Sequence, residues 1–145
     1  ERVTGYRRAL EEAGIAYVST LVVRGDFQHA SGFTAASQLL SLPGPPTAIF
    51  ACNDLMAMGA IGAATASGRR VPDDLSIAGF DDVRLAAFTN PALTTIAQPK
   101  FEMGKLAASL LVERIKGADI EPRHYTLDVH LVVRASTGPV AREAA

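Results

Sequence analysis

The chain has 145 residues, the size of one domain, and its 14 basic and 15 acidic side chains give a net charge of −1. Hydrophobic residues make up 48% and charged residues 20%, which excludes an intrinsically disordered protein. The near-neutral charge argues against a free-standing DNA-binding domain, which needs a basic surface. The single cysteine, Cys52, excludes an intrachain disulfide framework and a multi-cysteine zinc site.

Apolar residues at helical spacing predict four helices, each ended by a glycine or by a proline-rich turn. The helices are expected over residues 2–13, 31–42, 54–67 and 99–116. In the last of them, one apolar face is expected to point inward, and it consists of Met103, Leu106, Ala107, Leu110, Leu111 and Ile115.

Short apolar or β-branched runs predict strands between these helices, at 19–23, 47–51, 75–80 and 94–97. The runs at 47–51 and 75–80 are continuously apolar, which is typical of strands covered on both faces. Alternating residues predict one strand over 124–134, or two that bend near Asp128, and residues 138–145 are expected to be a frayed tail.

Strands that alternate with helices of this length are typical of right-handed βαβ units. The predicted fold is therefore α/β, with a parallel sheet and helices on both faces.

Ligands of open parallel sheets bind beyond the carboxyl ends of the strands, so the residues that follow each strand are the first candidates. Phe27, Asn53 and Asp81 stand at such positions, and Arg2 at the start of the first helix is expected to face the same rim. An aromatic ring, an amide and a carboxylate at one rim suit a small polyhydroxylated or heteroaromatic ligand.

Each candidate also has a purely structural interpretation. We expect Asp54 and Asp82, which stand before helical segments, to act as helix caps near the site. Asn53 could equally satisfy loop backbone groups, and Phe27 could pack on the helix below it. Arg2 could be a solvated residue, although a cation at a helix start is unfavourable for the helix dipole. Cys52 is expected to be a small buried hydrophobe.

Motifs that carry catalysis are missing from the sequence. It has no phosphate-binding Gly-rich loop, no dinucleotide fingerprint after a strand and no nucleophile elbow. The three histidines lack metal-ligand spacing. The Asp81–Asp82 pair lacks the neighbours of a magnesium-binding phosphoacceptor site. We therefore predict a protein that is not an enzyme and that uses no metal or cofactor.

Several long motifs occur in order along the chain and together resemble one family. They are RVTGYRRAL at 2–10, GDF at 25–27, TAIFACNDLMAMG at 47–59, GRRVPDDLSIAGFDD at 68–82, PALTTIAQP at 91–99 and LVVRAS at 131–136. This set resembles the effector-binding domain of the lac repressor (LacI/GalR) family of bacterial transcription regulators, over residues 2–137.

The resemblance implies a fold of two lobes, like that of periplasmic binding proteins, with the effector between them. Residues 1–92 plus 130–137 would form the C-terminal lobe, and residues 93–129 would be a returning segment of the other lobe. Residues 138–145 would remain a flexible tail. The helix-turn-helix that reads DNA in this family has no counterpart in these 145 residues.

The resemblance also implies roles for individual residues. Arg2 would make charged hydrogen bonds to the effector, Phe27 would stack on its ring, and Asn53 and Asp81 would bind hydroxyl or ring N–H groups. The implied dimer surface includes the helix at 54–67 and the segment after Asp82, with these candidates on the helix: Met56, Ala60 and Ala63.

The partners implied are a small effector, most simply a sugar, a second copy of the chain, and operator DNA through the part that has no counterpart here. The resemblance places the protein in the cytoplasm, away from membranes. The alternative is a sugar-binding protein of a transport system on the same fold. A small α/β enzyme is a third hypothesis, which the lack of a catalytic pair disfavours.

Overall fold

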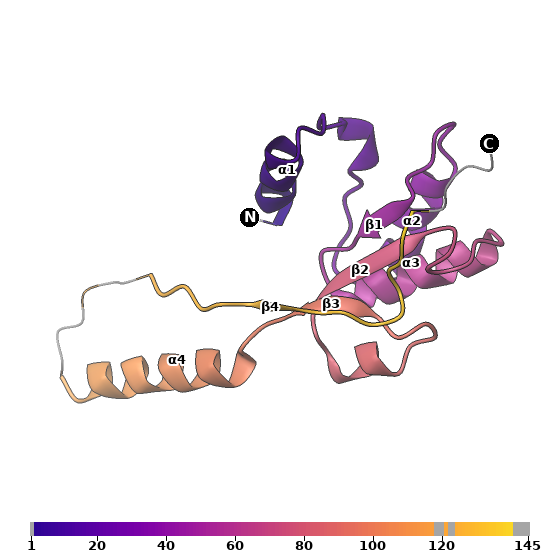
Figure 1. Ribbon diagram of the computed structural model, residues 1–145. Coiled ribbons are helices and arrows are strands. Elements are labelled where there is room, and N and C mark those ends of the chain that lie inside the picture. Colours follow the sequence, from indigo (N-terminus) through magenta and orange to yellow (C-terminus); the bar gives the residue numbers. More distant parts are fainter. Residues whose placement is uncertain (1, 118–120, 122–123, 141–145) are drawn as a thin grey trace.

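The computed structural model describes residues 2–117, 121 and 124–140, and its centre is a sheet of four strands (Figure 1). The strands stand side by side in chain order: β1 (Ala48–Phe50), β2 (Ser76–Asp81), β3 (Thr94–Ala97) and β4 (His130–Val132). The first three are parallel and β4 is antiparallel to β3. The predicted α/β architecture with a mostly parallel sheet is confirmed.

Helices α2 (His29–Leu40) and α3 (Asp54–Ala66) pack against each other, and α3 packs on β2. Two glycines allow the helices to approach so closely. A Cβ atom on Gly32 would collide with the backbone of Met56, and one on Gly59 would collide with the backbone of His29. The motif that contains Gly59 therefore encodes a tight helix–helix contact.

Helix α3 is apolar on nearly all sides because it lies in the core, between α2 and the sheet. This position contradicts the prediction that Met56, Ala60 and Ala63 form a dimer surface. Met56 is only 8% exposed, and Ala60 and Ala63 are 2% exposed. These three residues belong to the core, and they could contact a second chain only if the core were disrupted.

Helix α1 (Arg2–Glu12) forms as predicted, but the segment after it is not a strand. Residues Ser19–Leu21 form a 3-10 turn, and Val22 is extended (φ −120, ψ 110) without sheet partners. β-Branched residues favour extended backbone, but a strand also needs a neighbour to bond. Among the residues that the structure describes, no strand pairs with this segment by hydrogen bonds, so the prediction of a strand at 19–23 is wrong.

Strand β1 is not covered on both faces as its apolar sequence predicts. β1 is the edge strand of the sheet, and Ala48 and Phe50, which point to the same face, are exposed, the latter at 44%, because no helix of the described residues packs closely on that face. A cavity of about 190 Å³ borders this edge, lined by residues of α1, of 21–23, of β1 and of the two core helices. A hydrophobic run in the sequence predicts an apolar strand, but it does not predict which elements pack against that strand.

Helix α4 (Lys100–Ile115) forms where predicted, but its apolar face is not turned inward. No residue of α4 is buried, and Met103, Leu111 and Ile115 are 44%, 60% and 75% exposed. The helix projects away from the sheet beyond the end of β3 (Figure 1). The prediction of an inward face is therefore wrong for the described residues, which place no core against α4.

The C-terminal segment forms a shorter strand than its sequence predicts, but hydrogen bonds attach it to the rest of the protein further along the chain than expected. Only His130–Val132 pair with β3, and residues 124–129 form no strand. The backbone N–H of Gly138 donates to the hydroxyl of Ser76, and that hydroxyl donates to the carbonyl of Gly138. The expected frayed tail therefore does not begin at Gly138, and its part at 141–145 lies outside the described residues.

Candidate functional site

The carboxyl end of β2 carries an unusual turn. Asp81 and Asp82 both have positive φ angles, 116 and 49 degrees, which residues with a side chain rarely adopt. Each such residue costs on the order of 1–3 kcal/mol and persists only where its surroundings hold it. Backbone strain of this kind is common at functional sites, so the turn is a candidate site, and the ligand contact of Asp81 stays a prediction.

Arg2 reaches the same end of the sheet from the first turn of α1. Its guanidinium donates to the carbonyl of Cys52 and lies 3.5 Å from Oδ1 of Asp81. Its Cζ atom lies 4.3 Å from the ring centroid of Phe80 and 5.9 Å from that of Phe27. Cation–π and ionic contacts therefore fix the position of Arg2 at the rim.

Phe27 closes one side of this cluster. Its φ of 67 degrees is again in the left-handed region, and its side chain is 52% exposed. The carbonyl of Phe27 accepts a hydrogen bond of 2.9 Å from Nδ2 of Asn53. The loop therefore presents an aromatic face to solvent instead of burying it on the helix below.

Asn53, not Asp54, is the N-cap of α3. Its Oδ1 accepts a hydrogen bond of 2.9 Å from the backbone N–H of Met56, three residues ahead. With the bond to Phe27, both ends of the amide serve the protein backbone, as one of the two interpretations from sequence proposes. The predicted cap role of Asp54 is wrong because Asp54 lies inside the first turn.

Asp54 is instead completely buried, with 0% exposure. Its Oδ2 accepts from the backbone N–H of Val83 at 2.8 Å, and its Oδ1 accepts from the hydroxyl of Thr95. Burial raises the pKa of the Asp54 carboxyl, and the nearby Asp81 and Asp82 charges add to this effect, while the two hydrogen bonds oppose it.

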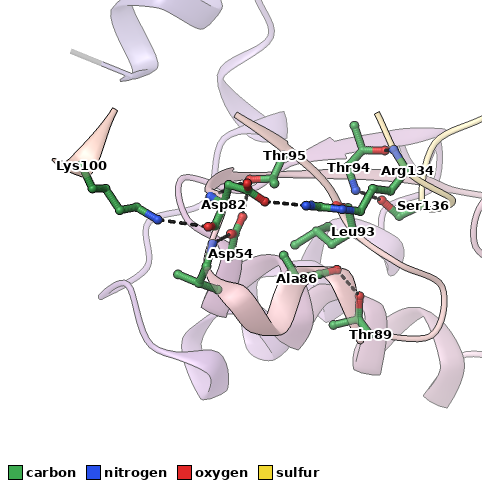
Figure 2. Close-up of polar contacts among 11 residues, drawn as sticks. Asp54, Asp82, Ala86, Thr89, Leu93, Thr94, Thr95, Lys100, Arg134 and Ser136 are labelled. Carbon is green, nitrogen blue, oxygen red and sulfur yellow. Dashed lines mark hydrogen bonds and ion pairs between the residues drawn. The ribbon is translucent and has the colours of Figure 1, made fainter. Parts of the chain in front are cut away.

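Asp82 is also not a helix cap. The residue that precedes the short 3-10 helix η2 (Arg84–Ala87) is Val83, and it makes no side-chain cap bond. Asp82 instead pairs with Arg134 at 2.7 Å, and its carbonyl accepts from Nζ of Lys100 at 3.0 Å (Figure 2). The Asp82 carboxylate pairs with Arg134 because the charged guanidinium attracts it more strongly than the uncharged N–H groups at the start of a helix do.

Three residues that contact Asp54, Asp81 or Asp82 are absent from the sequence-based candidates: Thr95, Gln98 and Arg134. Gln98 donates from Nε2 to Oδ1 of Asp81. It follows β3 directly, so the rule of strand ends could have found it. Thr95 and Arg134 carry no local signal, because their partners are far away in the sequence.

The structure therefore brings Arg2, Phe27, Asn53 and Asp81 to one rim, as predicted. The rim is open, and the cavity beside β1 touches it only at Arg2 and Cys52. Within residues 2–117, 121 and 124–140, no three metal-ligating side chains converge. In the same residues, no helix is both long and apolar enough to cross a membrane.

Comparison with known proteins gives one consistent result. The family model described as a periplasmic binding protein-like domain matches residues 1–137. The transcriptional repressor CytR of Escherichia coli K12 is 44% identical over 136 residues, and PurR of Photobacterium profundum is 43% identical over 136 residues. The matches cover 94% of this chain but only 40% and 41% of these repressors, so the chain spans about two fifths of their length.

Solved structures agree with the sequence matches. A complex of the transcriptional regulator CelR with cellobiose superimposes with a TM-score of 0.89 at 45% identity, over 94% of this chain and 42% of the other. A LacI family regulator from Enterococcus faecium with bound ribose gives 0.86 at 33% identity, over 96% and 51%. The chain belongs to the periplasmic binding protein-like domain family and, within it, corresponds to part of the effector-binding domain of LacI-type transcriptional regulators.

Proposed function

We propose that this chain is the effector-sensing part of a transcriptional regulator that binds a sugar or a similar small polar metabolite. Arg2, Phe27, Asn53 and Asp81 form its share of the binding site. The observation that carries the proposal is the convergence of Arg2 and Asp81 beside the exposed ring of Phe27.

The chemistry of this rim suits a polyhydroxylated ring. The apolar face of a sugar packs on an aromatic side chain, and its hydroxyls donate to a carboxylate and accept from a guanidinium. Asp81 and Arg2 are 26% and 33% exposed at their side chains, so both remain accessible to a ligand. Asn53 is only 8% exposed and bonds the backbone through both ends of its amide, so its contribution to ligand binding is limited to its second amide N–H.

The proteins of known structure support this ligand class. CelR is described with cellobiose and the Enterococcus faecium regulator with ribose, and both share this fold. Both ligands are sugars of different size, so the fold alone does not select one of them.

The mechanism that we propose is a shift of populations. An effector that binds one arrangement of the protein more tightly than another increases the population of that arrangement. In a regulator, the arrangement sets the spacing of two DNA-reading heads on a palindromic operator, and operator binding changes the affinity for effector by the same factor. The residues described here would perform the sensing step, in the cytoplasm.

The regulator is also proposed to act as a homodimer. Because Met56, Ala60 and Ala63 are buried, the dimer surface has to use the exposed apolar side chains of the same region. These are Leu55 on α3 and Leu85 and Phe88 after Asp82, which are 38%, 61% and 74% exposed. Large exposed apolar side chains of this kind are typical of interaction surfaces.

The binding proposal is tested by calorimetry on the protein expressed from its complete gene, titrated with ribose, cellobiose and further sugars. Asp81→Ala removes a charged hydrogen-bond acceptor and should weaken the best sugar roughly tenfold or more. Asp74→Ala, which removes an exposed carboxylate that pairs with Arg70, is the matched control and should bind normally. Equal affinity of wild type and Asp81→Ala would overturn the site assignment.

A further inference from the structure

Asp54 is the one carboxylate of this region that solvent does not reach. Its side chain lies at the start of α3, below the turn of Asp81 and Asp82, and neither caps the helix nor faces the rim. A buried carboxylate is costly unless it is paired or well hydrogen-bonded, so its presence calls for a reason.

The two partners of Asp54 lie on either side of that turn. Val83 comes directly after the turn and donates its backbone N–H to Oδ2 of Asp54. Thr95 is on β3 and donates its hydroxyl to Oδ1, while the backbone N–H of Asp82 points at the same hydroxyl at 3.4 Å (Figure 2). The Asp54 carboxylate thus ties the end of β2 to β3 and to the start of α3.

The surroundings leave Asp54 little freedom. A Cβ atom on Gly79, the residue of β2 that pairs with Thr95, would collide with Oδ1 of Asp54. Oδ1 therefore lies directly against the backbone of β2, and the side chain has no free space on that side into which it could rotate.

The turn itself needs such support. The positive φ angles of Asp81 and Asp82 are unfavourable for residues with a Cβ atom, although aspartate tolerates this region better than most. A second brace acts from the other side, where Arg134 pairs with Asp82 and also donates to the carbonyl of Leu93. The direction of the Asp81 side chain depends on these braces because Asp81 is the first residue of the turn.

We propose that Asp54 is a positioning residue of the effector site: its buried carboxylate fixes the turn at 81–83 and thereby holds Asp81 in contact with Arg2. The proposal rests on the proposed function in assigning Asp81 to the effector site. Asp54 itself touches no effector.

The test measures the Arg2–Asp81 contact without any ligand. The protein from the complete gene is labelled with 15N-arginine, and the Arg2 side-chain signals are assigned by their loss in Arg2→Lys. Exchange of the Arg2 guanidinium protons with solvent is then measured in wild type, Asp54→Asn, Thr95→Val and Thr95→Ser.

Asp54→Asn preserves the shape of the side chain, but it replaces one acceptor by a donor that faces the N–H of Val83 or the hydroxyl of Thr95. We expect Arg2 exchange to accelerate roughly two- to fivefold, because the partly exposed ion pair with Asp81 loosens while the hydrogen bond from Arg2 to the Cys52 carbonyl remains. Thr95→Val should accelerate it in the same direction, and Thr95→Ser, which keeps the hydroxyl, should restore the wild-type rate.

Two controls separate positioning from general loss of stability. Ile61→Val weakens the core from the middle of α3, about two helical turns after Asp54. Asp74→Asn removes a carboxylate at an exposed ion pair. Both should leave Arg2 exchange at the wild-type rate at temperatures well below unfolding.

The proposal is overturned if Thr95→Val leaves Arg2 exchange unchanged, or if Ile61→Val accelerates it as much as Thr95→Val does. If Asp54→Asn does not fold, the comparison of Arg2 exchange in Thr95→Val and Thr95→Ser tests the proposal by itself. Titration of wild type with ribose and cellobiose reports separately on the proposed function, because Arg2 exchange in the free protein does not depend on any sugar.

Discussion

The guanidinium of Arg2 and the carboxylate of Asp81 lie 3.5 Å apart, although Arg2 begins α1 and Asp81 ends β2, far along the chain. Neither side chain is buried, and such a partly exposed ion pair contributes little to stability. Its consequence is geometric: a donor and an acceptor of charged hydrogen bonds are held ready at one rim, so little ordering is needed when a ligand binds.

The contact between α2 and α3 makes a prediction about two glycines of the same helix. Gly59→Ala places a methyl group into the backbone of α2 and should destabilise the fold by about 2–3 kcal/mol. Gly62→Ala should instead stabilise it by about 0.5–1 kcal/mol, because its methyl group meets only the Phe33 ring at 3.5 Å and alanine favours helix. Urea denaturation measures both, and a stable Gly59→Ala protein would contradict the packing described here.

Arg134 is expected to be important for stability. Arg134→Met leaves the carboxylate of Asp82 without its partner and the carbonyl of Leu93 without its donor. The side chains of Arg134 and Asp82 are each less than one third exposed, so water replaces the lost contacts only in part. The expected loss is about 2 kcal/mol in the free energy of unfolding. Arg70→Met, at the exposed pair with Asp74, is the matched control and should cost clearly less. Equal losses would contradict the difference in burial.

The pKa of Asp54 predicts a pH dependence of stability. Burial raises this pKa above its ordinary value of 3.8, so between pH 3.8 and the folded-state pKa the folded protein binds more protons than the unfolded chain. Stability contributed by Asp54 therefore falls as the pH rises through this window. Asp54→Asn lacks the titration, so the stability difference between wild type and variant should shrink with rising pH and then stay constant. Denaturation curves from pH 4 upward measure it, and a difference that grows with pH would contradict the raised pKa.

The corrected dimer surface predicts the effect of a charge at Phe88. Phe88→Glu puts a carboxylate on the most exposed apolar side chain of the 83–88 region and should dissociate the proposed homodimer. Ile115→Glu, at an equally exposed apolar residue on α4, should leave the dimer intact. Sedimentation velocity on the protein from the complete gene measures both, and a dimer that survives Phe88→Glu would place the interface elsewhere.

Patterns within a short stretch of sequence predict the helices and strands that such a stretch determines by itself. The helices at 2–13, 31–42, 54–67 and 99–116 agree with the structure within a few residues, and the strand at 94–97 agrees at both ends. Helix ends also follow from residue type, since Gly14 and Gly68 take the positive φ that ends a helix. Periodicity and glycine positions carry this information within a few residues of chain.

What failed depends on neighbours that the sequence does not name. Residues 19–23 have the composition of a strand but no partner, and the apolar face of α4 has nothing described to cover it. The placement of Met56, Ala60 and Ala63 on a dimer surface rests on the family resemblance, whereas the apolar run of α3 also fits a core helix, which is what the structure shows.

The rim was predicted better than its supports. The rule of strand ends brings Asn53 and Asp81 to the rim through strands that do form, whereas it brings Phe27 there through a strand at 19–23 that does not form; Phe27 nevertheless lies at the rim. The rule says nothing about which carboxylate caps a helix, and so Asp54 and Asp82 were misassigned. Their true partners, Thr95 and Arg134, are brought to them only by the order of β2, β3 and β4 in the sheet.

The most direct test of the proposed sensing function is a crystal structure of the protein from its complete gene, with the sugar that it binds most tightly. We predict that the sugar ring lies on Phe27 and that its hydroxyls contact Asp81 and Arg2. A sugar bound elsewhere, for example in the cavity beside β1, without contact to Arg2 or Asp81, would contradict the proposed sensing function.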